Sequence, residues 1–265
     1  MKKIIAALDP MDNPWPVITF AVHLARNNAT AIQLVFLALP EGVDYDYPFP
    51  NDLSAAEDYF GAQSISGSNA QLIEDKTRLF KYESETAQIN FIAEKGITVT
   101  DLIKKSQDAG ILVADRGASF LAKVLPHLSC PALIAGEDHL PEKVILLFNG
   151  THKSQIAIES YLTLKTQFQN LPTYLISINP GEERENENYL DKLKPFFSDI
   201  SYKALHGNEQ KQLDNFLSGL SGSILVIMGA FGRSEISGFF HKSLTNAGQN
   251  EKGVSLLIYH HSMQN

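Results

Sequence analysis

Two glycines near the end of the chain carry the residue pattern with the clearest chemical meaning. Gly229 and Gly232 follow a short apolar run, Ile224 to Met228, which predicts a buried parallel strand. Glycines at the carboxyl end of a strand let backbone N–H groups approach an anion, and such loops bind phosphates in open α/β sheets. After nine further residues, Lys242 and Ser243 add a charge and a hydroxyl. The spacing therefore predicts a nucleotide phosphate site.

This segment resembles the ATP-binding loop of universal stress proteins, in which Gly, two residues, Gly, nine residues and Gly precede a Ser or Thr. Gly229, Gly232 and Ser243 fall on that pattern. Lys242 stands where the family has its third glycine, so it either replaces a backbone contact with a charge or blocks that contact. The resemblance implies a set of contacts to ATP in the C-terminal part of the chain. They are Asn149, Ser177, Met228, Gly229, Ala230, Gly232, Lys242, Ser243 and Leu244.

A polar residue stands at the end of the first apolar run in each half of the chain. These residues are Asp9 and Asn149. The resemblance assigns an Asp at this place to the adenosine pocket, so Asp9 keeps the family's residue and Asn149 replaces it. An amide accepts and donates hydrogen bonds but carries no charge. The alternative interpretation of both residues is a polar side chain at the turn that follows a strand.

The order of apolar runs and helical patterns repeats once along the chain. Helical patterns separate the apolar runs; Val17, Phe20, Ala21 and Leu24, for example, recur at helical spacing. The predicted strands are 3–8, 32–39, 87–93, 111–114 and 131–135, and then 143–148, 173–178, 200–204, 224–228 and 254–259. Alternating strands and helices predict an α/β fold with a parallel sheet. We therefore expect two domains, residues 1–139 and 140–265.

The resemblance implies a more specific architecture. It consists of two tandem, doubly wound, mostly parallel five-stranded sheets with strand order 3-2-1-4-5, related by a pseudo-twofold axis. The fifth strands, 131–135 and 254–259, should face each other, so that one chain imitates a dimer; further oligomerisation stays open. Residues 115–130 contain neither Gly-x-x-Gly nor Gly-Ser, so the first domain is expected to lack an ATP site. A single continuous sheet is expected to contradict the interpretation of the chain as a duplicated nucleotide-type module.

The amino-acid composition limits the kinds of molecule that the protein is expected to bind. The formal net charge of −8 argues against nucleic acid, because a phosphate backbone requires clustered Lys and Arg. No apolar run approaches the roughly 18 residues of a membrane helix. The first apolar run ends at Asp9, so it is interpreted as a strand of a cytoplasmic protein rather than as a secretion signal. The single cysteine, Cys130, excludes an internal disulfide and a multi-cysteine metal site, and is expected to be a small buried residue.

An acidic and aromatic segment, residues 41–60, interrupts the first half, and a helix is expected near 69–82. The segment is either a tolerated loop insertion or a protein-binding loop, because Tyr45, Tyr47 and Phe49 are residue types that anchor interfaces.

Two functional hypotheses follow. The first is a non-catalytic tandem protein of the stress response that acts through protein contacts or an unknown small ligand. The second is binding of ATP or another adenine nucleotide in the C-terminal domain only, with no metal required. Catalysis is disfavoured, because the sequence contains no G-x-S-x-G nucleophile elbow and no H-E-x-x-H zinc motif.

Overall fold

The computed structural model describes most of both halves of the chain. It covers residues 3–9, 14–26, 30–38, 91–137, 139–164, 168, 170–180, 183–229 and 253–259.

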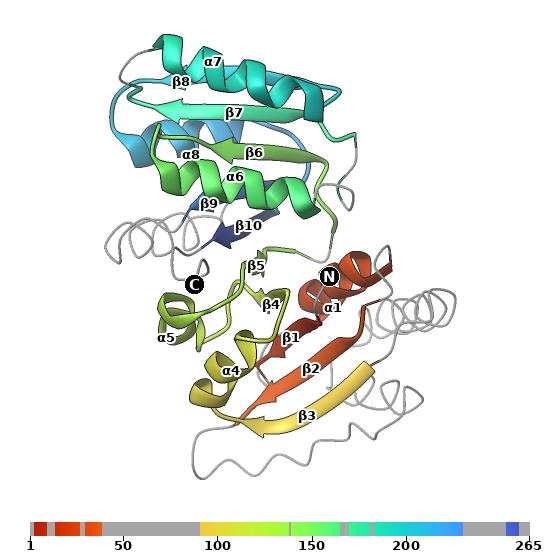
Figure 1. Ribbon diagram of the computed structural model, residues 1–265. Coiled ribbons are helices and arrows are strands. Elements are labelled where there is room, and N and C mark those ends of the chain that lie inside the picture. Colours follow the sequence, from red (N-terminus) through yellow and green to blue (C-terminus); the bar gives the residue numbers. More distant parts are fainter. Residues whose placement is uncertain are drawn as a thin grey trace, which may run out of the picture.

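The described strands form one ten-stranded sheet (Figure 1). The N-terminal half contributes β1 (Ile4–Leu8), β2 (Ile32–Leu37), β3 (Phe91–Ile97), β4 (Ile111–Asp115) and β5 (Ala132–Ala135). The C-terminal half contributes β6 (Lys143–Leu147), β7 (Thr173–Ile178), β8 (Ile200–Leu205), β9 (Ile224–Gly229) and β10 (Val254–Tyr259). The order is β3-β2-β1-β4-β5-β10-β9-β6-β7-β8, so each half has the expected 3-2-1-4-5 arrangement of parallel strands. The predicted α/β class with a mostly parallel sheet is confirmed.

The two halves meet at a seam where β5 pairs with β10. This pairing is antiparallel, with Leu257 opposite Leu133. The prediction of two separate sheets is therefore corrected to one sheet of two five-stranded halves, because main-chain pairing continues across the seam. The expectation that a single sheet would contradict a duplicated module is also wrong, since both halves keep the same strand order within that sheet. The fifth strands do face each other, and an antiparallel pair of equivalent strands is what a local twofold axis produces. The pseudo-twofold axis and the domain boundary between residues 139 and 140 stay predictions.

Helices cover both faces of the sheet. One apolar core lies under α1 (Trp15–Arg26), α6 (His152–Leu164) and α7 (Glu183–Leu193). The other lies under α4 (Val99–Ser106), α5 (Leu121–Val124) and α8 (Glu209–Gly219). Successive strand residues alternate between the two cores, which makes the molecule a three-layer α/β/α structure. None of the described helices combines the length and the apolar character needed to cross a membrane.

The β3 strand differs most from its predicted bounds. The sequence pattern predicts 87–93. Residues 87–90 lie outside the described part of the chain, and the described strand continues beyond 93 to Ile97. Sequence patterns missed its end because Glu94 is charged and resembles a turn residue. In the structure Gln33 donates to Glu94, and Lys105 Nζ lies 2.5 Å from the second carboxylate oxygen. An edge strand tolerates such charges, since only one of its sides is paired.

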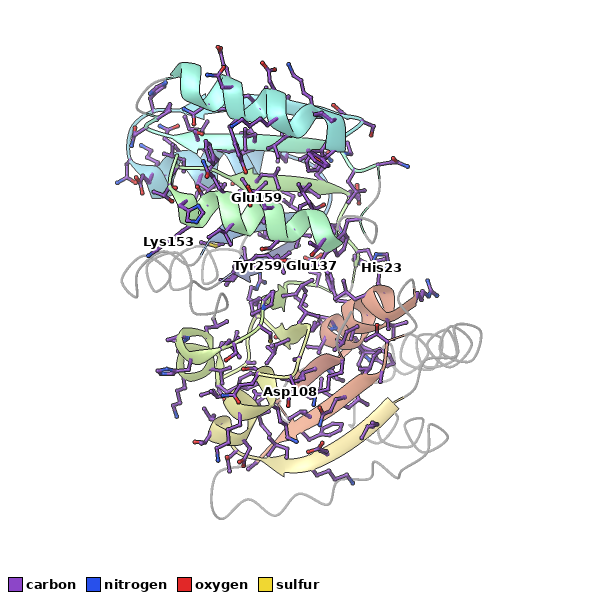
Figure 2. The ribbon with its side chains drawn as sticks, viewed as in Figure 1. His23, Asp108, Glu137, Lys153, Glu159 and Tyr259 are labelled. Atoms are coloured by element: carbon purple, nitrogen blue, oxygen red, sulfur yellow. The ribbon has the colours of Figure 1, made fainter. Side chains whose placement is uncertain are left out.

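Glycines allow the close approach of the two halves at the seam. A Cβ on Gly136 would lie 2.7 Å from the carbonyl carbon of Val254, and Gly136 N donates to Ser255 Oγ at 3.1 Å. A Cβ on Gly253 would similarly lie 2.7 Å from Cδ of Glu137, whose side chain lies between the halves in Figure 2. The seam therefore requires glycine at 136, where the obstacle is backbone.

Candidate functional site

Three of the predicted site residues that the structure describes, Asn149, Met228 and Gly229, lie around the carboxyl ends of β6 and β9, which we call the C-terminal switch point. Here the chain leaves β6 through α6 on one face of the sheet and reaches β9 from α8 on the other. Open α/β sheets bind ligands at such points. Since Leu146 lies opposite Ile227, Asn149 comes level with the residue after Gly229. The structure thus brings Asn149, Met228 and Gly229 to one edge of the sheet.

Gly229 packs directly against the first turn of α6. A Cβ at this position would lie 2.8 Å from the carbonyl oxygen of Lys153 and 3.1 Å from its carbonyl carbon. Only glycine therefore fits at position 229. The structural reason is that the end of β9 packs closely against the start of α6. Lys153 projects from the start of α6 (Figure 2) and is exposed. Sequence reasoning missed Lys153; its position just after a strand and at a helix start was the available signal.

The side chain of Asn149 shapes the turn that leads into α6. Its Oδ1 accepts hydrogen bonds from Thr151 N at 3.1 Å and from Thr151 Oγ1 at 2.6 Å. Thr151 Oγ1 in turn accepts from Ser154 N at 3.4 Å, so Thr151 caps the helix. Within the described part of the chain, Nδ2 of Asn149 makes no hydrogen bond. The acceptor of this exposed side chain is committed to the turn, whereas no described residue accepts from its donor.

Ser177 lies in the core, between β7 and α7. Only 1% of its surface is exposed, and its hydroxyl donates to Oδ1 of Asn186 at 3.2 Å. Beside this pair, the ring of Tyr189 stacks on Phe148 with centroids 4.3 Å apart. Ser177 is thus part of a buried polar contact beneath the strand ends, and its role as a ligand contact stays a prediction.

Several predicted features fall outside the described residues. These are the site residues Ala230, Gly232, Lys242, Ser243 and Leu244, the segment 41–60, and the helix near 69–82.

The carboxyl ends of β1 and β4 form the equivalent N-terminal switch point, where two carboxylates accept hydrogen bonds from the loop after β4. Oδ2 of Asp9 accepts from Ser119 Oγ at 2.8 Å and from Ser119 N at 3.4 Å. Oδ1 of Asp115 accepts from Gly117 N at 2.7 Å, an Asx turn that starts the loop after β4. Asp9 thereby ties the end of β1 to this loop. The expectation that the first half lacks an ATP site stays a prediction.

Burial controls the chemistry of two further groups. Burial raises the pKa of the Asp115 carboxyl, and the Gly117 N–H and the Arg116 charge oppose this rise only in part. Burial also raises the pKa of the Cys130 thiol to about 12, so the thiol stays protonated at neutral pH. The prediction that Cys130 is a small buried residue is confirmed.

Among the residues that the structure describes, no group of three His, Cys, Asp or Glu side chains is arranged to hold a metal ion.

Comparison with known proteins supports the fold. No protein-family model and no curated protein sequence matches the chain. A universal stress protein from Archaeoglobus fulgidus DSM 4304 is similar in structure, with a TM-score of 0.64 and 14% identity over 98% of this chain and 96% of that one. A putative universal stress protein from Pseudomonas aeruginosa UCBPP-PA14 gives 0.59 and 13% over 98% and 93%. A functionally unknown protein from Pseudomonas aeruginosa PAO1 gives 0.59 and 11% over 98% and 92%.

These likenesses define the class of fold. The chain has the two-half α/β fold seen in universal stress proteins, over nearly its whole length. The resemblance found in the sequence is confirmed at the level of the fold.

Proposed function

We propose that this chain is a tandem protein of the universal stress family that acts in the stress response by binding and not by catalysis. It engages a protein partner or a small ligand in the cytoplasm. The segment 41–60 supplies the aromatic anchors for a protein partner, and nucleic acid is not a partner because the chain carries a net charge of −8.

One relationship carries this proposal. At both switch points the polar residue that follows the first strand of that half accepts hydrogen bonds from a loop residue, from the loop after β4 in one half and from its own loop in the other. Asp9 accepts two hydrogen bonds from Ser119, and Oδ1 of Asn149 accepts two from Thr151. These bonds occupy the single amide oxygen of Asn149 and one of the two carboxylate oxygens of Asp9, which leaves fewer acceptors for a ribose hydroxyl. The arrangement favours a structural scaffold over a nucleotide pocket.

The electrostatics of the described residues also favour binding over catalysis. Catalytic nucleophiles and bases need pKa values shifted toward neutrality and a partner within hydrogen-bond reach. The thiol of Cys130 is buried with its pKa raised to about 12, which leaves it unreactive.

The protein-binding role is tested by replacing the aromatic anchors. The triple variant Tyr45→Ser, Tyr47→Ser and Phe49→Ser is compared with the wild type by chemical cross-linking in the cytoplasm of the native host. A partner that is lost in the variant and retained in Lys123→Gln, a change on the exposed surface of α5, supports the proposal. Equal cross-linking of the wild type and the triple variant counts against it.

A second candidate function is binding of ATP or another adenine nucleotide at the C-terminal switch point alone. Gly229 favours it, because the absence of a Cβ brings the strand end against the start of α6. Helix starts carry partial positive charge, and Lys153 adds a full one. In this candidate, Met228 and Ala230 line the strand end, and Asn149 and Ser177 face the nucleoside. Gly232, Lys242, Ser243 and Leu244 contact the phosphates.

This candidate is tested by thermal unfolding with ATP, ADP and AMP, since a ligand that prefers the folded state raises the midpoint. Gly232→Val is the informative variant. Gly229→Ala is not, because its Cβ would meet the backbone of Lys153 and destabilise the fold without any ligand. A midpoint rise that disappears in Gly232→Val supports nucleotide binding.

A further inference from the structure

We propose that the peptide Asn149–Gly150 is a site of spontaneous deamidation, at which the amide side chain of Asn149 becomes a carboxylate. The sequence contains no other Asn-Gly pair. This pair lies in the turn between β6 and α6, at the C-terminal switch point. The inference is independent of the proposed function, because it concerns the covalent structure of the chain itself and requires neither a partner nor a ligand.

The reaction uses the main-chain nitrogen that follows the asparagine. The N–H of Gly150 loses its proton to water or hydroxide, and the nitrogen forms a bond to Cγ of Asn149. The Cγ–Nδ2 bond then breaks, and Nδ2 takes up a proton and leaves as ammonia. The product is a five-membered succinimide ring. Water opens the ring at either of its two carbonyl groups, which gives aspartate or isoaspartate, so the net change is uptake of one water and release of one ammonia.

The two nitrogen atoms that take part in this reaction are not held by hydrogen bonds. No described residue accepts from the N–H of Gly150 or from Nδ2 of Asn149. Both residues are exposed, so water reaches the attacking nitrogen and the ammonia can leave. Gly150 has a φ of 76°, which favours glycine, and a Cβ there would meet nothing within 4 Å. The attacking nitrogen therefore has no neighbouring side chain to hinder it.

The amide carbonyl of Asn149 is polarised by two donors. Its Oδ1 accepts from Thr151 N at 3.1 Å and from Thr151 Oγ1 at 2.6 Å. When the nitrogen of Gly150 adds to Cγ, negative charge develops on Oδ1, and donors already aimed at this oxygen stabilise that charge as an oxyanion hole does. The main-chain N–H of Asn149 donates to Ser154 Oγ at 3.4 Å, which holds the residue at the start of α6. The turn thus combines an activated carbonyl group with an unbonded main-chain nitrogen.

Asn208 provides an internal comparison. It is also exposed and also caps a helix, because its Oδ1 accepts from Lys211 N at 3.0 Å at the start of α8. The next residue is Glu209, which places a Cβ beside the nitrogen that would have to attack. The negative charge of its carboxylate also disfavours loss of a proton from that N–H. Since both asparagines cap helices, the glycine at 150 is the feature that favours reaction at Asn149.

Conversion to aspartate changes the charge of the C-terminal switch point and keeps the connectivity of the main chain. The new carboxylate retains an oxygen to accept from Thr151, and it lies at the start of α6, where the helix dipole and the exposed Lys153 favour a negative charge. The chain then carries a strand-end aspartate in both halves, as Asp9 already is in the first. Isoaspartate instead adds a methylene group to the main chain and alters the turn. Deamidation is therefore a one-way change of charge that accumulates with the age of the protein.

The experiment is incubation of the full folded chain at mildly alkaline pH, followed over time by ion-exchange chromatography and peptide mass spectrometry. We expect an acidic species that accumulates and carries the modification at Asn149. Conversion there should be at least about tenfold faster than at Asn208, because glycine places no Cβ beside the attacking nitrogen. The acidic species should elute with the variant Asn149→Asp. It should not form in Asn149→Gln, which keeps an amide but requires a larger ring.

The same chain unfolded in urea is the control for the effect of the turn. If Asn149 stays intact in the folded chain, the proposal is wrong, and conversion in urea would then show that the turn protects the amide. Equal rates at Asn149 and Asn208 would contradict the role given to Gly150. An acidic species that persists in Asn149→Gln would place the modification at another residue and would equally rule out this site.

Discussion

Ser119 and Asp9 are separated by 110 residues in the chain, and the hydroxyl of Ser119 donates to Oδ2 of Asp9 at 2.8 Å. The bond joins the end of β1 to the loop after β4. At the equivalent place in the other half, Asn149 accepts from Thr151, only two residues away. The same fold position therefore holds a long-range tie in one half and a local turn in the other. This difference is the structural basis for treating the two halves as functionally unequal.

We expect the hydrogen bond from Ser119 to Asp9 to stabilise the folded state. Ser119→Ala removes a hydrogen bond to a charged acceptor, for which we expect a loss of about 1–2 kcal/mol in the free energy of unfolding. Urea unfolding measures it. Thr163→Ala is the matched control, because the hydroxyl of this exposed residue donates only to the carbonyl of Ser160 in its own helix. Equal stabilities of Ser119→Ala and Thr163→Ala would show that the tie contributes nothing.

The close packing at the seam between β5 and β10 leads us to expect a second and larger loss of stability. Gly136→Ala adds a Cβ that must displace the backbone of Val254, and backbone cannot move aside as a flexible side chain can. We expect a loss of about 2–4 kcal/mol, in the range of overpacked core substitutions. Gly219→Ala, at the end of α8, serves as control, because a Cβ there meets nothing within 4 Å. A neutral Gly136→Ala would mean that the halves do not meet as described.

Much of this fold could be predicted because its signals are local. Each predicted strand overlaps a described one, since buried parallel strands are continuous apolar runs such as Ile224 to Met228. The seam was harder to predict. That the sheet continues from β5 into β10 depends on contacts between segments more than 100 residues apart, and Gly136 looks like any glycine after a strand. The charges that end the apolar pattern at Glu94 concealed the true extent of the edge strand β3.

The candidate site was predictable only in part. The position of Gly229 at the end of its strand followed from the sequence pattern, as did the place of Asn149. The burial of Ser177 did not, because it depends on how α7 places Asn186 over β7.

The raised pKa of Asp115 predicts a pH dependence. Burial raises the folded-state pKa above the ordinary value of 3.8, so the charged carboxylate destabilises the folded state above the folded pKa. This penalty falls as the pH drops and is absent below the unfolded value. Asp115→Asn keeps an oxygen to accept from Gly117 N. The variant should therefore be more stable than the wild type near neutral pH, with the difference vanishing near about pH 3.

Thermal unfolding across that pH range measures the effect of Asp115→Asn. The control is Asp108→Asn, a change at an exposed aspartate that is labelled in Figure 2 and is expected to alter stability little. A variant that is less stable than the wild type at neutral pH would show that the charge of Asp115 is favourable, for example through Arg116, and would reverse the expected sign of the effect.

The most direct test of the central claim, that the strand-end polar residues serve the fold and not a nucleotide, is equilibrium dialysis of the full chain against ATP. The account predicts no saturable binding up to ~1 mM ATP, a concentration that corresponds to about 4 kcal/mol of binding free energy. Saturation near one ATP per chain, abolished by Gly232→Val, would contradict the account and establish the C-terminal switch point as a nucleotide site.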